Sequence, residues 1–343
     1  MPAKPEIIDQ LVTLRDWLRF AVSHFNAAEL AYGHGTGNAM DEAAFLILET
    51  LHLPIDQLEP WLDARLTMPE RMRLASIIDA RISTRKPAAY LMNCAYIGAR
   101  RFYVDERVIV PRSYIGELLD GGLDAFVLEP GEVARILDLC TGGGSLAILA
   151  ALAFPEAHVD AVDISAGALQ VAARNVADYG LGDRITLRRS DLFAELEGPR
   201  GCEVGNRSAR EGCDVGNRSA REARYDLILS NPPYVTTAAV DAFPPEYKAE
   251  PVLAHLGGKD GLDLVRRILA EAGEHLTSRG QLVVEIGMGR DVLEAERPDL
   301  PFLWLDTETS SGEVFALPAS ALTNPRPPKT APRTVKSRRK ASR

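Results

Sequence analysis

A polar amide, two prolines and an aromatic ring follow one another in the segment Ser230-Asn231-Pro232-Pro233-Tyr234. The segment comes directly after the apolar run 225–229, which predicts a buried strand. Because proline fixes φ and has no N–H, Pro232 and Pro233 cannot continue a central strand. The Asn231 side-chain oxygen and a backbone carbonyl can therefore accept both N–H bonds of a planar amide or an exocyclic amine, with Tyr234 covering its face. A Pro-Pro turn with a capping asparagine is the structural alternative.

A glycine-rich turn is the second segment suited to ligand binding. Asp138 lies in the apolar run 135–140, and Thr141, Gly142, Gly143 and Gly144 follow. Glycines between a first strand and its helix let a ligand approach the backbone closely at the carboxyl edge of a sheet. A tight turn with no ligand is again the structural alternative.

Carboxylates end the next two predicted strands. Asp163, followed by Ile164, ends the run 158–163, where a carboxylate can accept both ribose hydroxyls of a nucleotide-like cofactor. Asp191, followed by Leu192, comes after the run 185–190, at a position suited to an adenine amino group. The turn and the two acids together predict a cofactor site.

Two classes of cofactor fit this pattern. A dinucleotide favours the spacing G-x-G-x-x-G and a helix N-terminus directed at its pyrophosphate. Here the glycines are contiguous, and Asp138 lies three residues before Thr141. That acid suits a cation better than a phosphate. S-adenosyl-L-methionine carries an amino group and a sulfonium and has no phosphate, so it is the preferred cofactor, and a dinucleotide-dependent dehydrogenase stays a rival.

Alternating strands and helices must position these residues. Candidate strands after residue 134 are 135–140, 158–163, 185–190, 225–230 and 281–286, and candidate helices are 144–154, 165–179 and 260–277. The alternation predicts an α/β fold with a parallel, doubly wound sheet and helices on both faces. Two closing strands, 302–307 and 313–318, have a turn at 309–312 between them that is short enough for a hairpin.

Residues 1–90 predict a small helical domain. Apolar residues recur every three or four positions over 6–25, 41–53 and 69–85, with Asp41 and Pro69 as helix start signals. The glycine-dense loop 32–38 contains His34, which we expect to be structural. Residues 95–110 alternate and bend at Gly98, which predicts a β-hairpin within a linker, 91–111, that joins the helical domain to a larger domain, 112–318.

Composition excludes several classes of protein. No apolar run reaches membrane-spanning length, and the first ten residues lack the layout of a signal peptide, so we expect a cytoplasmic protein with no membrane partner. The four cysteines lack metal-ligand spacing, which predicts free thiols and no metal site.

Charge is distributed unevenly. Residues 319–343 hold eight lysines and arginines and no acid, which gives this tail a charge of +8. Because the net charge of the whole chain is −9, residues 1–318 carry −17. An acidic body disfavours a grip on duplex DNA. The tail is rich in proline, serine and threonine, which predicts a disordered, solvated segment, with a weak RNA contact as the functional alternative.

These residues resemble the HemK-type protein N(5)-glutamine methyltransferase family. The similarity is greatest to its PrmB branch, which methylates a glutamine of the third large-subunit ribosomal protein, and it covers about residues 7–318. Gly143 replaces a serine that relatives carry in the turn. The segments that carry the resemblance are Tyr32 to Thr36, Asp41 to Ala43, Phe102 to Val108, Val110 to Ser113, Ile115 to Leu118, Asp160 to Ser165, Glu246-Tyr247, Glu250-Pro251 and Asp260-Gly261-Leu262.

The resemblance implies a fold and a site. The fold is that of a class I S-adenosylmethionine-dependent methyltransferase, a Rossmann-like seven-stranded sheet whose last strand is antiparallel, preceded by a substrate-binding helical domain. Asn231, Pro232 and Tyr234 are implied as catalytic, and with Pro233 they bind the glutamine. The implied cofactor-binding residues are Asp138, Thr141, Gly142, Gly144, Asp163, Ile164, Asp191, Leu192 and Asn231.

Other functions stay open at this stage. The release-factor branch of the family shares the catalytic domain but lacks the Gly-His-Gly loop. Adenine-N6 DNA methyltransferases also carry Asn-Pro-Pro-Tyr, since an exocyclic amine resembles an amide. A non-catalytic ribosome-assembly protein could retain the fold. Glu246, Tyr247 and Glu250 fit either a loop near the substrate or a structural element.

A tandem duplication interrupts the larger domain. The segment GCEVGNRSARE (201–211) is followed by GCDVGNRSARE (212–222), and two loop-like units cannot form a solenoid. We interpret them as a disordered insertion, which costs little because loop-closure entropy grows slowly with length. Deleting 201–222 should therefore leave methyl transfer near the wild-type rate in a radiolabel assay. A large loss of activity in the shortened chain would contradict this interpretation.

Overall fold

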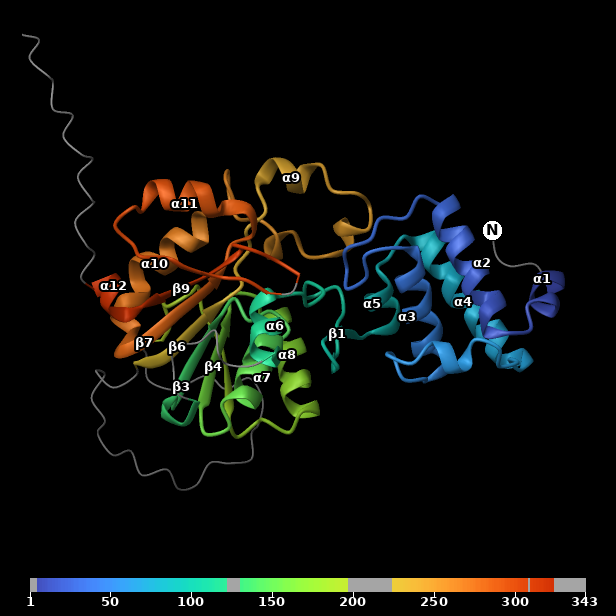
Figure 1. The fold of residues 1–343 in the computed structure, drawn as a ribbon, viewed down its shortest axis with the longest axis horizontal. Coiled ribbons are helices and arrows are strands. Elements are labelled where there is room, and N and C mark those ends of the chain that lie inside the picture. The colour runs from blue at the N-terminus through green and yellow to red at the C-terminus, as the bar shows by residue number, and fades with distance from the viewer. Residues whose placement is uncertain (1–4, 122–129, 197–223, 308, 324–343) are drawn as a thin grey trace, which may run out of the picture.

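The computed structural model describes residues 5–121, 130–196, 224–307 and 309–323. Figure 1 shows a helical N-terminal domain beside a larger domain built on a twisted sheet. The duplicated segment 201–222 lies outside the described residues.

The N-terminal domain contains five α-helices in the described residues. The predicted helix over 6–25 is wrong as one element, because residues 11–13 divide it. Thr13 caps the second helix in a capping box, in which its side chain accepts from the Asp16 N–H and the Asp16 carboxylate accepts from the Thr13 N–H. The helices are α1 (Pro5–Gln10), α2 (Leu14–Ala27), α3 (Ala39–Leu51), α4 (Met68–Thr84) and α5 (Ala88–Met92).

Of the two predicted helix starts, Asp41 is wrong and Pro69 is confirmed. Asn38, not Asp41, caps α3, since its side-chain oxygen accepts from the N–H groups of Met40 and Asp41. Pro69 lies in the first turn of α4 as predicted, directly after Thr67 and Met68.

The predicted hairpin is present but shorter than 95–110. Strands β1 (Ala95–Ile97) and β2 (Arg100–Phe102) pair antiparallel around Gly98, whose φ is +55°. The alternating valines beyond Phe102 have another cause, because Val104, Val108 and Val110 are buried against α5 and α8 rather than paired in a strand. The helix α6 (Tyr114–Gly121) follows.

The larger domain has a seven-stranded sheet in the order β5-β4-β3-β6-β7-β9-β8. Strands β3 to β7 pair in parallel, and β9 is antiparallel to both β7 and β8, which confirms the reversed last strand. The strands are β3 (Arg135–Leu139), β4 (His158–Asp163), β5 (Ile185–Arg189), β6 (Tyr225–Ser230), β7 (Leu276–Glu285), β8 (Leu303–Leu305) and β9 (Val314–Pro318).

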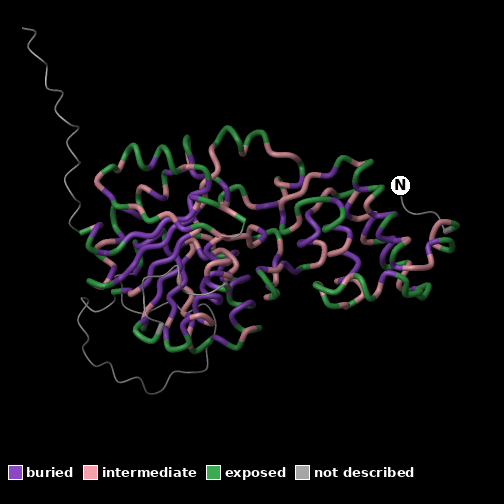
Figure 2. The backbone as a smooth tube through the Cα atoms, viewed as in Figure 1, coloured by how far each residue is buried: buried purple, intermediate pink, exposed green. Residues whose placement is uncertain are grey.

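Both faces of the sheet are covered. Successive residues of a strand point to opposite faces, so Leu227 and Leu229 enter the cluster formed with α6 and α7 (Ser145–Ala153), whereas Ile228 enters the cluster formed with α10 (Asp263–His275). Figure 2 shows the resulting concentration of buried residues in the sheet. The other helices of this domain are α8 (Ala166–Asp178), α9 (Thr237–Asp241), α11 (Arg290–Glu296) and α12 (Ala319–Thr323).

The prediction that a disordered tail begins at residue 319 is wrong for its first five residues, which form α12. Ala319 and Ala321 are buried, and Leu322 packs against Gly273 of α10. The proline-rich, basic composition of the whole window concealed this short apolar start. The remainder of the tail, 324–343, lies outside the described residues. Among the described helices, none combines the length and the apolar character that crossing a membrane requires.

Candidate active site

A solvent-open cavity lies at the carboxyl edge of the sheet, where β3 and β6 end side by side. Ligands bind at this edge in open α/β sheets, beside the strand at which the sheet order reverses. The glycine-rich turn and the asparagine after β6 both line the cavity, as the sequence predicts. Its lining residues are Phe102, Tyr103, Val104, Ile109, Pro111, Arg112, Ser113, Cys140, Thr141, Gly142, Gly143, Ser145, Leu146, Asn175 and Asn231.

The turn has an unusual backbone. Cys140, Gly142 and Gly144 all have positive φ, at +58°, +54° and +81°. Gly143 differs, because a Cβ there would meet its nearest side chain at an ordinary 3.6 Å. Position 143 therefore does not require glycine. Asn175 of α8 holds the turn from outside by donating to the Gly143 carbonyl at 2.8 Å.

Asp138 lies beneath the turn and does not line the cavity. Its Oδ2 accepts from the Thr141 hydroxyl at 2.5 Å, and within the described residues its Oδ1 has no hydrogen-bond partner. Burial raises the pKa of this carboxyl to about 7. The structure thus places Asp138 one layer behind the position in which sequence reasoning expected it.

Asp163 joins the end of β4 to the turn. Its Oδ2 accepts from the Gly142 N–H at 2.9 Å, and its Oδ1 accepts from the Ser165 N–H at 2.8 Å. The carboxylate is only partly buried, and each oxygen keeps a second lone pair for a further donor. Ile164 beside it is 45% exposed, which leaves an apolar surface next to the carboxylate.

The third predicted acid has a different environment. Asp191 is exposed and forms an ion pair with Arg267 at 3.0 Å, and it is not among the cavity residues. Leu192 is buried and has a φ of +53°. Thr141 and Gly142 therefore line the cavity, Asp163 contacts the turn through the Gly142 N–H without itself lining the cavity, and Asp191 lies to one side.

The acceptor motif, Asn231-Pro232-Pro233-Tyr234, is oriented by a backbone carbonyl. The Asn231 side-chain nitrogen donates to the Arg112 carbonyl at 3.1 Å, which fixes the plane of the amide and leaves its oxygen as the acceptor. Pro232 is buried, and Pro233 and Tyr234 are partly buried. Arg112, two residues before α6, thus sets the direction of a side chain at the end of β6.

Tyr234 is held by a buried carboxylate and two close glycines. Its hydroxyl donates to the Glu285 Oε1 at 3.2 Å. A Cβ at Gly261 would lie 2.2 Å from the Tyr234 carbonyl oxygen, and one at Gly287 would lie 2.8 Å from the Tyr234 ring. Only glycine allows this approach at either position, so the motif has little freedom to move.

Glu285 supports Tyr234 and the start of α6, and the sequence did not predict this role. It is 1% exposed, and its Oε2 accepts from the Ser113 hydroxyl at 2.8 Å and from the Tyr114 N–H at 2.9 Å. Its position at the end of β7, level with the acids that end other strands, is a signal that could have found it. Arg112 offered no such signal, because the group that touches Asn231 is its backbone carbonyl.

Comparison with known proteins identifies the family. A family model described as a methyltransferase domain matches residues 136–202. A ribosomal protein uL3 glutamine methyltransferase from Bradyrhizobium diazoefficiens is 53% identical over 319 residues, covering 91% of this chain and 92% of the relative. Relatives of the same name from Bordetella pertussis and Burkholderia pseudomallei are 53% and 50% identical, over 90% of this chain and 95% of each relative. The chain belongs to the uL3 glutamine methyltransferase family.

The methyltransferase resembles solved structures only at a coarser level. A methyltransferase from Pyrococcus furiosus is 16% identical, with a TM-score of 0.41 over 64% of this chain and 88% of that chain. The hMettl16 catalytic domain in complex with a MAT2A 3'UTR hairpin is 14% identical, with a TM-score of 0.44 over 73% and 82%. Family membership therefore rests on the sequence relatives. It confirms the glutamine methyltransferase resemblance over the dehydrogenase and DNA methyltransferase alternatives.

Glu285 predicts a specific dependence of stability on pH. Burial raises its pKa from the ordinary 4.5 to about 7, so the folded methyltransferase binds this proton at a higher pH than the unfolded chain does. The resulting stabilisation is complete below about pH 4.5 and is lost as the pH rises through 7. Relative to Glu285→Gln, the wild-type free energy of unfolding should fall by up to about 3 kcal/mol between pH 5 and pH 8.

Urea denaturation of both proteins at four pH values measures this difference. The buried Asp138 titrates in the same range, but it is present in both proteins and cancels in the comparison. Stability curves that stay parallel from pH 5 to pH 8 would contradict the prediction.

Proposed function

We propose that this methyltransferase transfers a methyl group from S-adenosyl-L-methionine to the side-chain amide nitrogen of a glutamine in ribosomal protein uL3. The observation that carries the proposal is that Asn231, its amide fixed by the Arg112 carbonyl, lines the same cavity as the glycine-rich turn. The identity of 50–53% to relatives named for this activity supports the substrate.

The donor groups around the turn suit this cofactor. It has ribose hydroxyls and a cationic amino group but no phosphate. The Asp163 carboxylate has lone pairs for the hydroxyls, and the Thr141 to Gly143 backbone lines the cavity. Asp138, behind Thr141, contributes negative charge when ionised. When bound, S-adenosyl-L-methionine supplies an electrophilic methyl group on its sulfonium.

The adenine ring of the cofactor would be bound by residues that follow β4 and β5. We assign the exposed Ile164 to cover the ring and the segment Asp191-Leu192 to its amino group. Asp191 must give up or share its ion pair with Arg267 to do so. Gly144 acts through the shape of the turn, since it does not itself line the cavity.

The acceptor motif would make the glutamine amide nitrogen a better nucleophile. The lone pair of a glutamine amide nitrogen is delocalised into its carbonyl, so the nitrogen attacks poorly. The Asn231 side-chain oxygen and the Pro232 carbonyl would accept its two N–H bonds, direct its lone pair into the cavity and stabilise positive charge as it forms. Tyr234, held by Glu285, would cover the face of the amide with help from Pro233. The proton can leave after methyl transfer, so no strong base is required.

The domains and the tail have proposed roles of their own. We assign residues 1–90 to substrate binding, the linker 91–111 to joining the domains and 112–318 to catalysis. A ribosomal protein is made in the cytoplasm, and we place the enzyme there. An RNA contact by the basic tail, 324–343, stays a prediction from charge alone.

Incubation with radiolabelled S-adenosyl-L-methionine and purified uL3, followed by mass spectrometry of the labelled peptide, tests the function. The proposal expects one methylated glutamine. Release factors and adenine-containing DNA in parallel reactions should take up no label. Label on either one instead of uL3 would assign the enzyme to that substrate.

Replacing Asn231 tests the acceptor role. Asn231→Ala should lower turnover at least about 10²-fold, as the loss of one transition-state hydrogen-bonding group does in other enzymes. The variant should stay folded, because the side chain is only partly buried. Thr236→Ala, which removes the cap of the short helix α9, is the matched control and should retain turnover. Turnover of Asn231→Ala within a few-fold of wild type would refute the assignment.

Replacing Asp163 tests the cofactor role. Asp163→Ala should weaken S-adenosyl-L-methionine binding by roughly tenfold or more, since hydrogen bonds to a charged group contribute about 1.5–3 kcal/mol each. Isothermal titration calorimetry measures the dissociation constant. Asp178→Ala removes an exposed carboxylate paired with Arg174 and should leave it unchanged. Equal affinities in wild type and Asp163→Ala would exclude the ribose role.

A further inference from the structure

A loop between the two domains is built around buried charges. This bridging loop, residues 242–262, runs from α9 to α10 and contains the short turns η4 (Tyr247–Ala249) and η5 (Val252–Ala254). Figure 1 shows it reaching from the sheet domain toward the N-terminal helices. Two of its carboxylates, Glu246 and Glu250, are 0% and 3% exposed. Such burial of charge requires partners, and these differ between the two residues.

Glu250 binds Val110 and Arg112, in the segment that precedes α6. Its Oε1 accepts from the Val110 N–H at 2.9 Å, and its Oε2 accepts from the Arg112 guanidinium at 3.0 Å. His255 lies 2.9 Å from Oε2 and His34 lies 3.7 Å from it. Burial alone would raise the pKa of Glu250, but the contacts with His255 and Arg112 hold it at about 2. The carboxylate is therefore ionised, and it holds Arg112 through both oxygens.

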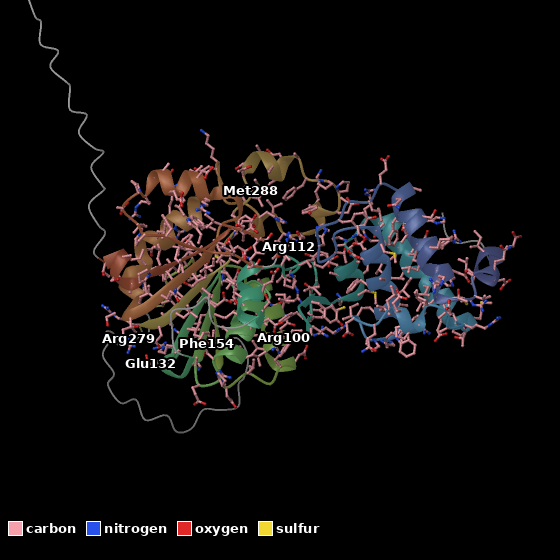
Figure 3. The ribbon with its side chains drawn as sticks, in the orientation of Figure 1. Arg100, Arg112, Glu132, Phe154, Arg279 and Met288 are labelled. Atoms are coloured by element: carbon pink, nitrogen blue, oxygen red, sulfur yellow. The ribbon has the colours of Figure 1, made fainter. Side chains whose placement is uncertain are left out.

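Arg112 connects three parts of the molecule. Its guanidinium also donates to the Gly33 carbonyl at 3.2 Å, in the Gly-His-Gly loop of the N-terminal domain. Its own carbonyl accepts from the Asn231 side chain at 3.1 Å. Figure 3 shows Arg112 at the junction of the two domains. The backbone at Arg112 is thus restrained on one side by Glu250 and Gly33, while on the other side it orients Asn231.

The Gly-His-Gly loop fits closely against the bridging loop. The Tyr247 hydroxyl donates to the Tyr32 carbonyl at 3.0 Å, and the Tyr247 ring lies 4.2 Å from the His34 ring. A Cβ at Gly33, whose φ is +118°, would lie 2.0 Å from the Tyr247 hydroxyl oxygen. A side chain at this position would push Tyr247 away, so the closeness of the contact depends on glycine.

We propose that Glu250 is a positioning residue for methyl transfer. It fixes Arg112 against the N-terminal loop, and the Arg112 carbonyl in turn fixes the amide plane of Asn231. The seating of the N-terminal domain on the bridging loop thereby sets the orientation of the group that holds the glutamine. This inference rests on the proposed role of Asn231 and extends it to the contact between the domains.

Glu246 provides a matched control within the same loop. It accepts from the Ala31 N–H at 3.1 Å and pairs with Arg85 at 2.7 Å, so it too connects the bridging loop to the N-terminal domain. Its hydrogen bonds and ion pairs in the described residues go to that domain and not to Arg112. Loss of either carboxylate should weaken the domain contact, but only loss of Glu250 should reach Asn231.

The experiment compares Glu250→Gln and Glu246→Gln for steady-state methylation of uL3 and for thermal unfolding. Both variants should unfold at lower temperature. Glu250→Gln should lower kcat at least about tenfold, with the KM for S-adenosyl-L-methionine within about threefold of wild type, because misorientation acts on the chemical step. Glu246→Gln should keep kcat within about threefold.

A double-mutant cycle identifies the route of the effect. If Glu250 acts through Asn231, Glu250→Gln should lower kcat no further in an Asn231→Ala background. An equal loss of kcat in the two glutamine variants would overturn the proposal, as would a full effect of Glu250→Gln without the Asn231 side chain. If Glu250→Gln fails to fold, Arg112→Lys replaces it in both comparisons, because lysine keeps the charge but cannot span Glu250 and the Gly33 carbonyl together.

A spectroscopic readout separates this inference from the proposed function. The side-chain NH₂ resonances of Asn231 in a ¹⁵N-labelled sample report its bond to the Arg112 carbonyl. Glu250→Gln should shift them, and Glu246→Gln should leave them in place. A wild-type enzyme that does not methylate uL3 would contradict the proposed function alone. Unshifted Asn231 resonances in Glu250→Gln would overturn the positioning role whatever the substrate is.

Discussion

The hydrogen bond from the Asn231 side chain to the Arg112 carbonyl is the contact on which the acceptor site depends. An asparagine amide has a donor end and an acceptor end, and only the acceptor end is useful toward a substrate amide. A fixed carbonyl on one side decides which end faces the cavity. Because Glu250 and the Gly33 carbonyl restrain Arg112, residues that do not line the cavity have a part in setting the chemistry.

The fold was largely predictable from the sequence, because each central strand of a parallel sheet is a short apolar run between turn signals. The predicted helix and strand boundaries were wrong where a local signal, such as a helix cap, outweighed the periodicity of the apolar residues. A capping box at Thr13 divides what looked like one helix, and Asn38 begins another before Asp41. The valines from Val104 to Val110 alternate because of burial rather than strand pairing.

The meeting of the glycine-rich turn and Asn231 at one edge of the sheet was predictable, but the places of Asp138 and Asp191 and the supporting contacts were not. Asp163 and Asn231 follow strands that end at one edge, so the topology brings them together. Glu285 ends a strand, as Asp163 does, but the tertiary contacts that Glu285 and Glu250 make with the segment 110–114 are not revealed by any spacing along the chain. Asp191 follows a predicted strand, as a cofactor-binding carboxylate would, yet in the structure its charge is paired with Arg267.

The reversed last strand also decides where the described chain ends. Because β9 runs against β7, with Pro318 opposite Gln281, the described chain finishes in α12 near the amino ends of the parallel strands. The chain also re-enters there after the duplicated segment, at Arg224 just before β6. The helix α12 and Arg224 therefore both lie on the side of the sheet away from the cavity.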